Sequence, residues 1–269
     1  MAEKIVFIGA GSMAEAMIAG LVDAQVLNCQ NIYVTNKENK QRLKALNEAY
    51  GVTCLSDKQA ALKEANMIIL ATKPHDAEAA LAAIKQDVTS DQLVISVVAG
   101  LETTFIEQRF SGDIPVVRAM PNTSAAVGAS ATAICAGAYV QESHLKAAEM
   151  LLQTIGTTTV VAEKDMHAVT AISGSGPAYM YYLIEAMEKA ALDAGLDRDV
   201  ARSLLIQTVV GAGNMLASSS DAPALLRKKI TSPNGTTEAG INTLQAHDFE
   251  AIIKACVESA RARSVELGR

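Results

Sequence analysis

The chain has 269 residues, a length typical of one large domain or two ordinary ones with room for a full hydrophobic core. Half of the residues (50%) are hydrophobic and 19% are charged, so the composition excludes an intrinsically disordered chain. The formal net charge of −6 argues against a nucleic-acid partner.

The first part of the sequence alternates short β-branched runs with helical patterns, the order typical of parallel strands joined by crossover helices. Several runs are apolar at consecutive positions, as expected of strands that helices cover on both faces. The candidate strands are residues 4–8, 31–35, 67–71, 93–97, 116–119, 132–136 and 158–162.

From Glu163 onward the strand signal stops and long helical patterns take over. The candidate helices are residues 178–194, 198–218, 223–230, 236–246 and 249–267. We therefore expect an α/β protein with an N-terminal, Rossmann-type, mostly parallel sheet over residues 1–162. An all-helical C-terminal domain would follow over residues 163–269.

The candidate helix 198–218 is apolar around nearly its whole circumference, with Leu204 on one side and Ile206 and Val210 elsewhere. A small helical domain has difficulty burying such a helix alone, which favours a partner subunit. A central helix of a single bundle is the alternative that the sequence leaves open.

A glycine-rich turn follows the first candidate strand and opens a helical pattern. In Gly9-Ala-Gly-Ser-Met-Ala14, the first glycine permits a tight turn and Gly11 lets backbone amides approach a pyrophosphate. Position 14 governs how the helix packs on the strand, and alanine is allowed there. The turn predicts a dinucleotide site to which Gly9, Gly11, Ser12 and Met13 contribute.

The end of the second candidate strand indicates which nicotinamide cofactor is preferred. NAD sites usually place Asp or Glu there, to bind the ribose hydroxyls. This chain has Asn36 and Lys37 instead, which suit a 2′-phosphate, so the prediction is NADPH, with NADH as a secondary cofactor. Glu38 is the counter-argument, because a shift of one residue would bring its carboxylate into the pocket.

Three later strand ends would also lie at the ligand-binding edge of an open parallel sheet. Each turns with Gly or Pro, although any one of them alone is equally typical of a plain loop. The candidate cofactor-binding residues at these ends are Ala71, Lys73, Pro74, Ala99, Gly100, Pro121 and Asn122.

Other classes of site and segment lack support. Residues 5–10 follow a lysine as in a secretory signal, but glycines interrupt them, and residues 125–140 are too weakly hydrophobic to span a membrane. The four histidines have no metal-ligand spacing, so no metal is expected, and the four cysteines form no CxxC pair. A location in the reducing cytoplasm, without a membrane partner, follows.

Taken together, the motifs resemble those of the pyrroline-5-carboxylate reductase family over essentially the whole chain. The most specific ones lie late in the sequence, whereas many dehydrogenases share the glycine turn. In chain order they are Gly9–Ala14, Lys73-Pro74, Ala99-Gly100, Arg118–Thr123, Ser173–Tyr179 and Ser232–Thr237.

The resemblance implies an oxidoreductase that acts on a CH–NH group. It would transfer hydride from NAD(P)H to 1-pyrroline-5-carboxylate and give L-proline, the last step of proline biosynthesis. It also implies a helical domain that intertwines between subunits, with the active site at the interface of a homodimer or of a ring of dimers.

The small anionic substrate needs a carboxylate receptor, and Ser232-Pro-Asn-Gly-Thr-Thr237 opens a helix. Amides of Gly235, Thr236 and Thr237, with the positive end of the helix dipole, would supply it beside Ser232. The resemblance gives Thr237 the catalytic role of a hydroxyl donor near the ring nitrogen. Without the resemblance, these hydroxyl residues would more often be helix caps.

The chain departs from the family pattern at three positions. Asn234 stands in place of a glycine, Ser124 in place of a proline, and Lys228 where an Asp is often found. Asn tolerates a positive φ best among the other residues, so the loop can be preserved. The other two departures bear on substrate affinity more than on reaction type.

Two alternatives are a related enzyme and a protein of a different class, a non-catalytic sensor. A 3-hydroxyacid dehydrogenase would need a catalytic lysine shortly after Gly174-Ser-Gly176, but the next lysine is Lys189. A non-catalytic NADPH-binding sensor would have no need of the Gly-Thr-Thr element that this chain has.

Overall fold

The computed structural model describes residues 3–37 and 39–268. The chain divides into two compact units, residues 1–177 with 259–269, and Ala178–Glu258. Segment 163–177, which the sequence assigned to the helical domain, packs with the sheet unit. The boundary between residues 162 and 163 stays a prediction.

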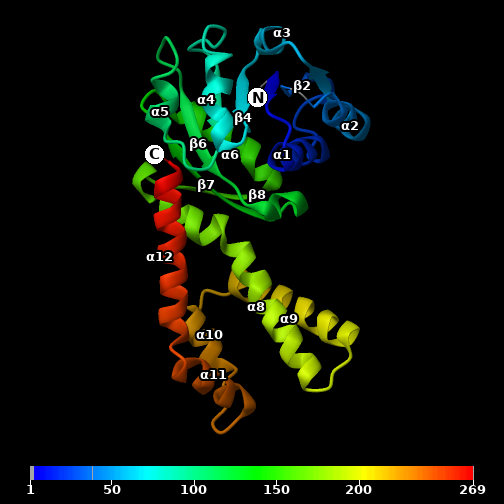
Figure 1. Cartoon of the computed structure of the whole chain (residues 1–269), viewed down its shortest axis with the longest axis vertical. Coiled ribbons are helices and arrows are strands. Elements are labelled where there is room, and N and C mark those ends of the chain that lie inside the picture. Colours follow the sequence, from blue (N-terminus) through cyan, green and yellow to red (C-terminus); the bar gives the residue numbers. More distant parts are fainter. Residues whose placement is uncertain (1–2, 38, 269) are drawn as a thin grey trace. The chain divides into compact units, whose positions relative to one another are not determined.

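The first unit contains an eight-stranded sheet with the order β3-β2-β1-β4-β5-β6-β7-β8 (Figure 1). Every neighbouring pair is parallel except β6 with β7, which confirms the expected mostly parallel, Rossmann-type sheet. The strands are β1 (Ile5–Ile8), β2 (Ile32–Thr35), β3 (Thr53–Leu55), β4 (Met67–Leu70), β5 (Leu93–Ser96), β6 (Val116–Met120), β7 (Ser130–Ala136) and β8 (Gly156–Val160).

Alternate strand residues face two separate hydrophobic clusters, because successive side chains of a strand point to opposite faces. Phe7 and Ile69 belong to one cluster, and Val6 and Ile68 belong to the other. The first face is covered by α1 (Ser12–Asp23), α2 (Lys40–Tyr50) and α6 (Glu142–Leu152). The second face is covered by α3 (Lys58–Leu62), α4 (Pro74–Ala82) and α5 (Thr103–Glu107).

Short helical segments complete this unit. Segment η4 (Glu163–Asp165) leads into α7 (Met166–Val169), whose buried Met166 packs on Ala133 and Cys135 of β7. A π-helical turn, η5 (Thr170–Gly174), then leads into α8. The remaining 3-10 turns are η1 (Cys29–Asn31), η2 (Thr123–Val127) and η3 (Gln153–Ile155).

The second unit is helical, as expected. Its elements are α8 (Gly176–Asp193), α9 (Arg198–Ser218), α10 (Pro223–Lys229), α11 (Thr236–Ala246) and α12 (Phe249–Leu267), of which α8 begins and α12 ends in the first unit. Gly195 takes φ +90 after α8. Asp197 then caps α9, because its Oδ1 accepts the backbone N–H of Asp199 at 2.9 Å.

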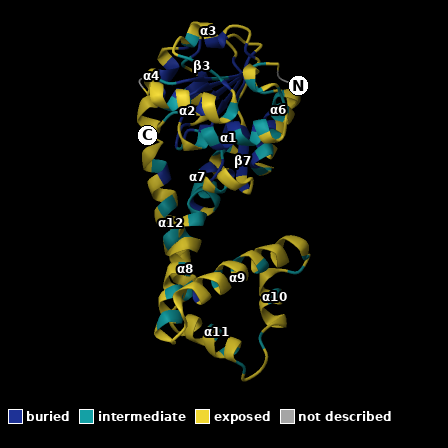
Figure 2. Ribbon diagram, turned by 90° about the vertical axis from the view of Figure 1, so that its right-hand side faces the viewer, coloured by how far each residue is buried: buried dark blue, intermediate teal, exposed yellow. Residues whose placement is uncertain are grey.

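The second unit buries very little of its own surface (Figure 2). Within residues 178–258, Ala201 alone is buried, and large apolar side chains of α9 such as Leu204 (57% exposed) face outward. Among the described residues, α9 is also the one helix long and apolar enough to cross a membrane by length and composition. An exposed apolar surface of this kind usually marks a contact with another molecule, and a partner subunit could bury it.

Candidate functional site

The glycine turn after β1 has the geometry that a dinucleotide site needs. Gly9 takes φ +114, and a Cβ there would lie 2.4 Å from the Ala71 carbonyl oxygen, so only glycine fits. A Cβ on Gly11, the N-cap of α1, would enter open space. The packing of the protein itself therefore does not require glycine at position 11. A pyrophosphate that approaches the backbone closely would require it.

The first residues of α1 continue this surface. Ser12 is exposed and Met13 is partly buried, while Ala14 is fully buried at the helix-to-strand contact. The first amides of a helix have no carbonyl partner within the helix, so they are donors available to an anion.

A side chain of α2, the helix that follows β2, contacts the glycine turn and α1. The Nε of Arg42 donates to the Ala10 carbonyl at 2.9 Å, and its guanidinium forms an ion pair with Glu15 of α1. Asn36, at the end of β2, accepts the N–H of Asn39 at 3.0 Å, and Lys37 is exposed. Arg42 was not among the predicted site residues, because its contacts to Ala10 and Glu15 arise only when the chain folds.

The turn after β4 adds a polar atom that the fold leaves unsatisfied. Ala71 donates its N–H to the Ile8 carbonyl at 2.9 Å, and Lys73 and Pro74 form the N-cap and first residue of α4. Between them, the Thr72 hydroxyl is buried without a hydrogen-bond partner. A buried hydroxyl without a hydrogen-bond partner destabilises the fold. A nucleotide bound at this edge of the sheet would supply that partner to Thr72. Thr72 lies inside the predicted turn but was not among the predicted residues.

The loop after β5 contains Ala99, partly buried, and Gly100, buried with φ +85. A Cβ on Gly100 would lie 3.0 Å from the Leu267 carbonyl oxygen at the end of α12. The end of the chain therefore packs directly on the predicted cofactor loop.

The end of β6 is joined to the segment before α8. Asn122 uses both ends of its side-chain amide inside the protein: Oδ1 accepts the N–H of Ser124, and Nδ2 donates to the Ser173 carbonyl, each at 3.0 Å. A Cβ on Gly174 would lie 2.8 Å from Cε of Met120. The start of the Ser173–Tyr179 motif thus sits at the carboxyl edge of β6, beside the buried Pro121.

The Ser232–Thr237 turn lies in the second unit, at the start of α11. Asn234 takes φ +57, as expected for a residue in place of a glycine, and its N–H donates to Glu238 at 2.7 Å. The structure differs from expectation at Gly235, because its amide donates to the Ser232 carbonyl at 3.0 Å and closes the turn. A Cβ on Gly235 would lie 2.5 Å from Ser232 Oγ and 3.0 Å from the Ser232 carbonyl oxygen, so a larger residue there would require the Ser232 side chain to move.

The amides left for an anion are then those of Thr236 and Thr237, in the first turn of α11, where both residues are exposed. Lys228 lies in the basic last turn of α10, beside Arg227 and Lys229. The predicted cofactor residues all lie in the first unit and the predicted substrate residues in the second.

The glycine turn at the β1 end of a mostly parallel sheet, followed by a helical unit, defines the class of two-domain nicotinamide-dependent oxidoreductases. Comparison with known proteins makes this specific. Residues 163–267 match the family model for pyrroline-5-carboxylate reductase dimerisation, and residues 4–100 match that for coenzyme F420-dependent NADP oxidoreductases.

Curated relatives match over nearly the whole chain. Pyrroline-5-carboxylate reductase 2 of Bacillus subtilis is 48% identical, with 98% of this chain and 95% of the relative covered. A pyrroline-5-carboxylate reductase structure from Coxiella burnetii has a TM-score of 0.92 at 33% identity, covering 99% of both chains. The NADP-bound pyrroline carboxylate reductase of Plasmodium falciparum has a TM-score of 0.89 at 29% identity, covering 99% of this chain and 98% of that one. The chain belongs to the pyrroline-5-carboxylate reductase family, whose members are NAD(P)H-dependent oxidoreductases acting on a CH–NH group.

Proposed function

We propose that this chain reduces 1-pyrroline-5-carboxylate to L-proline, the last step of proline biosynthesis, with NADPH as the preferred reductant. The observation that carries the proposal is the 48% identity over 98% of the chain to a pyrroline-5-carboxylate reductase. That span includes both the glycine turn of the first unit and the Ser232–Thr237 turn of the second.

The preference for NADPH rests on the end of β2. Asn36 and Lys37 occupy the position where an acidic residue would bind the ribose hydroxyls of NADH. A 2′-phosphate there gains a cationic partner, and no carboxylate of residue 36 or 37 repels it. The NADP-bound relative from Plasmodium falciparum supports this choice.

The substrate carries a carboxylate and a ring imine, and the α11 turn suits the carboxylate. The amides of Thr236 and Thr237, at the positive end of an 11-residue helix, face the anion, and Ser232 adds a hydroxyl. Holding the ring by its carboxylate restricts the orientation of its imine carbon, and such positioning lowers the barrier to hydride transfer.

Bound NADPH supplies the hydride that converts the imine carbon to a CH₂ group. When the ring nitrogen is already protonated, the product is a neutral secondary amine, so no strong general acid is required. The Thr237 hydroxyl orients the ring and contacts this nitrogen. Its role is that of a preorganised donor, because a threonine hydroxyl does not titrate near neutral pH.

The working form that we propose is a cytoplasmic homodimer, or a ring of such dimers. The helical unit has one buried residue of its own and matches a dimerisation family over residues 163–267. A second copy of α9 and its neighbours is the natural cover for this apolar surface. The four cysteines are free thiols in the structure, which suits a reducing compartment.

The test is the oxidation of NADPH by the purified protein with and without 1-pyrroline-5-carboxylate, followed by nicotinamide absorbance and by detection of proline. We expect substrate-dependent oxidation and proline in equal amounts, and faster turnover with NADPH than with NADH at low cofactor concentration. Binding of NADPH without oxidation would identify a sensor instead.

A further inference from the structure

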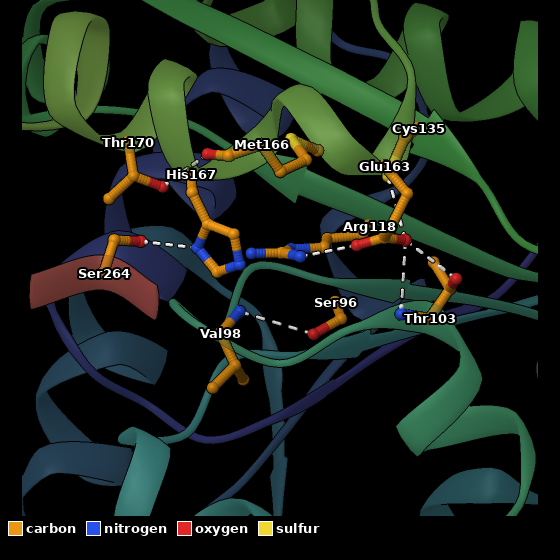
Figure 3. Close-up of polar contacts among 10 residues, drawn as sticks. All are labelled: Ser96, Val98, Thr103, Arg118, Cys135, Glu163, Met166, His167, Thr170 and Ser264. Atoms are coloured by element: carbon orange, nitrogen blue, oxygen red, sulfur yellow. Dashed lines mark hydrogen bonds and ion pairs between the residues drawn. The ribbon is translucent and has the colours of Figure 1, made fainter. Parts of the chain in front are cut away.

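Residues 97–102 form the loop between β5 and α5. They include Ala99 and Gly100, two of the predicted cofactor-binding residues, which we expect to lie beside the nicotinamide and its ribose. This loop, called here the nicotinamide loop, is held at its start and its end by groups from distant parts of the sequence (Figure 3). Its middle packs against the end of α12. None of these groups was among the predicted site residues.

The end of the nicotinamide loop is fixed by the Glu163 carboxylate. The Thr103 hydroxyl donates to Glu163 Oε2 at 2.8 Å, and the Thr103 backbone N–H points to the same oxygen at 3.3 Å. The other carboxylate oxygen pairs with the Arg118 guanidinium. Cys135 Sγ donates to Oε2 at 3.3 Å. A single carboxylate thus joins α5, β6, β7 and the start of segment 163–177.

The start of the loop lies against the same ion pair. Ser96, the last residue of β5, pairs in register with Arg118 of β6, which in turn pairs with Cys135 of β7. The Ser96 hydroxyl accepts a hydrogen bond from the N–H of Val98 at 3.4 Å. This bond closes the first turn of the loop. Arg118 is 1% exposed, so its charge depends on Glu163 for compensation.

The middle of the loop is packed against the end of the chain. A Cβ on Gly268 would lie 2.6 Å from the Gly100 carbonyl oxygen, so the two backbones are nearly in contact. The last turns of α12 are held in place by Ser264, whose hydroxyl is 3.0 Å from Nδ1 of His167. Ser264 is 5% exposed.

The carboxylate at the centre of this network is ionised at neutral pH. Burial alone would raise the pKa of Glu163, but hydrogen bonds from Thr103 and Arg118, together with the Arg118 charge, outweigh burial and hold that pKa below its ordinary value. Burial and the nearby carboxylate raise the pKa of Cys135 to about 12, so its thiol stays protonated and remains a donor.

We propose that Glu163, Thr103 and Ser264 are positioning residues that set the place of the nicotinamide loop for hydride transfer. The segments that hold the loop, 163–177 and 259–268, are the two connections to the helical unit Ala178–Glu258. The nicotinamide loop, together with Thr103 at its end, therefore contacts both of these connecting segments. This inference rests on the proposed function, because it assigns the loop to a nicotinamide that donates hydride.

The decisive variant is Thr103→Val, which keeps the shape of the side chain and removes its hydroxyl. Affinity for NADPH comes mainly from the phosphates at β1 and β2, whereas the hydride distance depends on the nicotinamide. We expect kcat to fall about 10-fold while the Kd for NADPH, measured by its fluorescence, changes less than about twofold. Thr103→Ser should restore kcat, and Thr104→Val, at the exposed neighbour, is the matched control.

A second pair tests the end of the chain. Ser264→Ala removes the bond to His167 and is expected to lower kcat in the same way, with the exposed Ser259→Ala on the same helix as its control. Hydrogen exchange of the amides in residues 97–103, measured without any ligand, should be faster in Thr103→Val and Ser264→Ala than in their controls.

The outcomes separate the two proposals. Wild-type protein that does not oxidise NADPH with pyrroline-5-carboxylate contradicts the proposed function, and the exchange rates then still decide whether these residues position the loop. Active wild-type protein with equal kcat in Thr103→Val and Thr104→Val overturns the positioning role. A rise in the Kd for NADPH that matches the fall in kcat also overturns it, because the effect would then extend to the whole cofactor site.

Discussion

The hydroxyl of Thr237 stands in the first turn of α11, exposed and beside the amides that suit a carboxylate. We predict that Thr237→Ala lowers kcat/KM for pyrroline-5-carboxylate by about 10- to 100-fold, because the lost donor acts on the ring nitrogen as the iminium becomes an amine. The Kd for NADPH should not change. Steady-state kinetics and fluorescence titration measure the two quantities.

Two further variants show whether the loss in Thr237→Ala comes from the missing hydroxyl. Thr237→Ser keeps a hydroxyl and should recover most of the activity. Thr243→Ala removes a hydroxyl from the same helix, where it donates to the Ala239 carbonyl at 3.1 Å, and should leave kcat/KM unchanged. Equal efficiency of Thr237→Ala and Thr243→Ala would remove Thr237 from the mechanism.

The side chain of Lys37 is the second residue that carries a prediction. Lys37→Glu places a carboxylate where NADH-dependent relatives of this fold have one, and it repels a 2′-phosphate. We predict that kcat/KM with NADPH falls at least about 10-fold relative to NADH. Lys44→Glu makes the same change of charge on the exposed face of α2, where Lys44 is 76% exposed, and should leave the ratio close to that of the wild type. Undiminished preference for NADPH in Lys37→Glu would contradict the phosphate interpretation.

Among the elements, the turn before α11 depends on one backbone conformation. Asn234 takes φ +57, which costs an ordinary L-residue about 1 kcal/mol and costs Asn or Gly less. We predict that Asn234→Ala lowers the free energy of unfolding by about 1 kcal/mol, while Asn234→Gly leaves it within about 0.5 kcal/mol of the wild type. Urea denaturation followed by circular dichroism checks both, and equal stability of the two variants would contradict this account.

The elements also show how far local sequence determines structure. The expected helices 198–218, 236–246 and 249–267 have the same bounds in the structure. Asp197 caps the start of the first of them, and long helical patterns continue through each one. Strand β3 was missed, since three partly buried residues, Thr53–Leu55, form no period that a sequence can display. The π-helical turn Thr170–Gly174 was also not expected, and no local signal marks it.

The residues of the candidate site also fall into those that local sequence predicts and those that only the fold brings together. Glycines such as Gly9 were predictable, because a tight turn after a strand is a local event with a local residue requirement. The contributions of Arg42, Thr72 and Glu163 were not predictable, because each follows from neighbours brought together by the fold. The amide of Gly235 was misjudged for a related reason, since its acceptor on Ser232 is created by the turn itself.

At the scale of the whole molecule, the two units differ in how they satisfy the hydrophobic effect. The sheet unit buries its apolar side chains in clusters on both faces, as a chain of its size can. The helical unit leaves Leu204, Ile206 and Val210 about half exposed, at 57%, 52% and 48%. Burying each of these against a partner would contribute on the order of 1–2 kcal/mol, so an interface along α9 would hold subunits together firmly.

Leu204→Glu tests this interface. A carboxylate buried against apolar side chains is strongly disfavoured, so we predict at least an about 100-fold weaker association and loss of activity at low protein concentration. Met150→Glu is the matched control, because Met150 on α6 of the sheet unit is 53% exposed and should tolerate the charge. Light scattering during gel filtration measures the mass of each variant across a dilution series. If Leu204→Glu kept the wild-type mass at every concentration, α9 would not belong to the interface, and its apolar surface would need another cover.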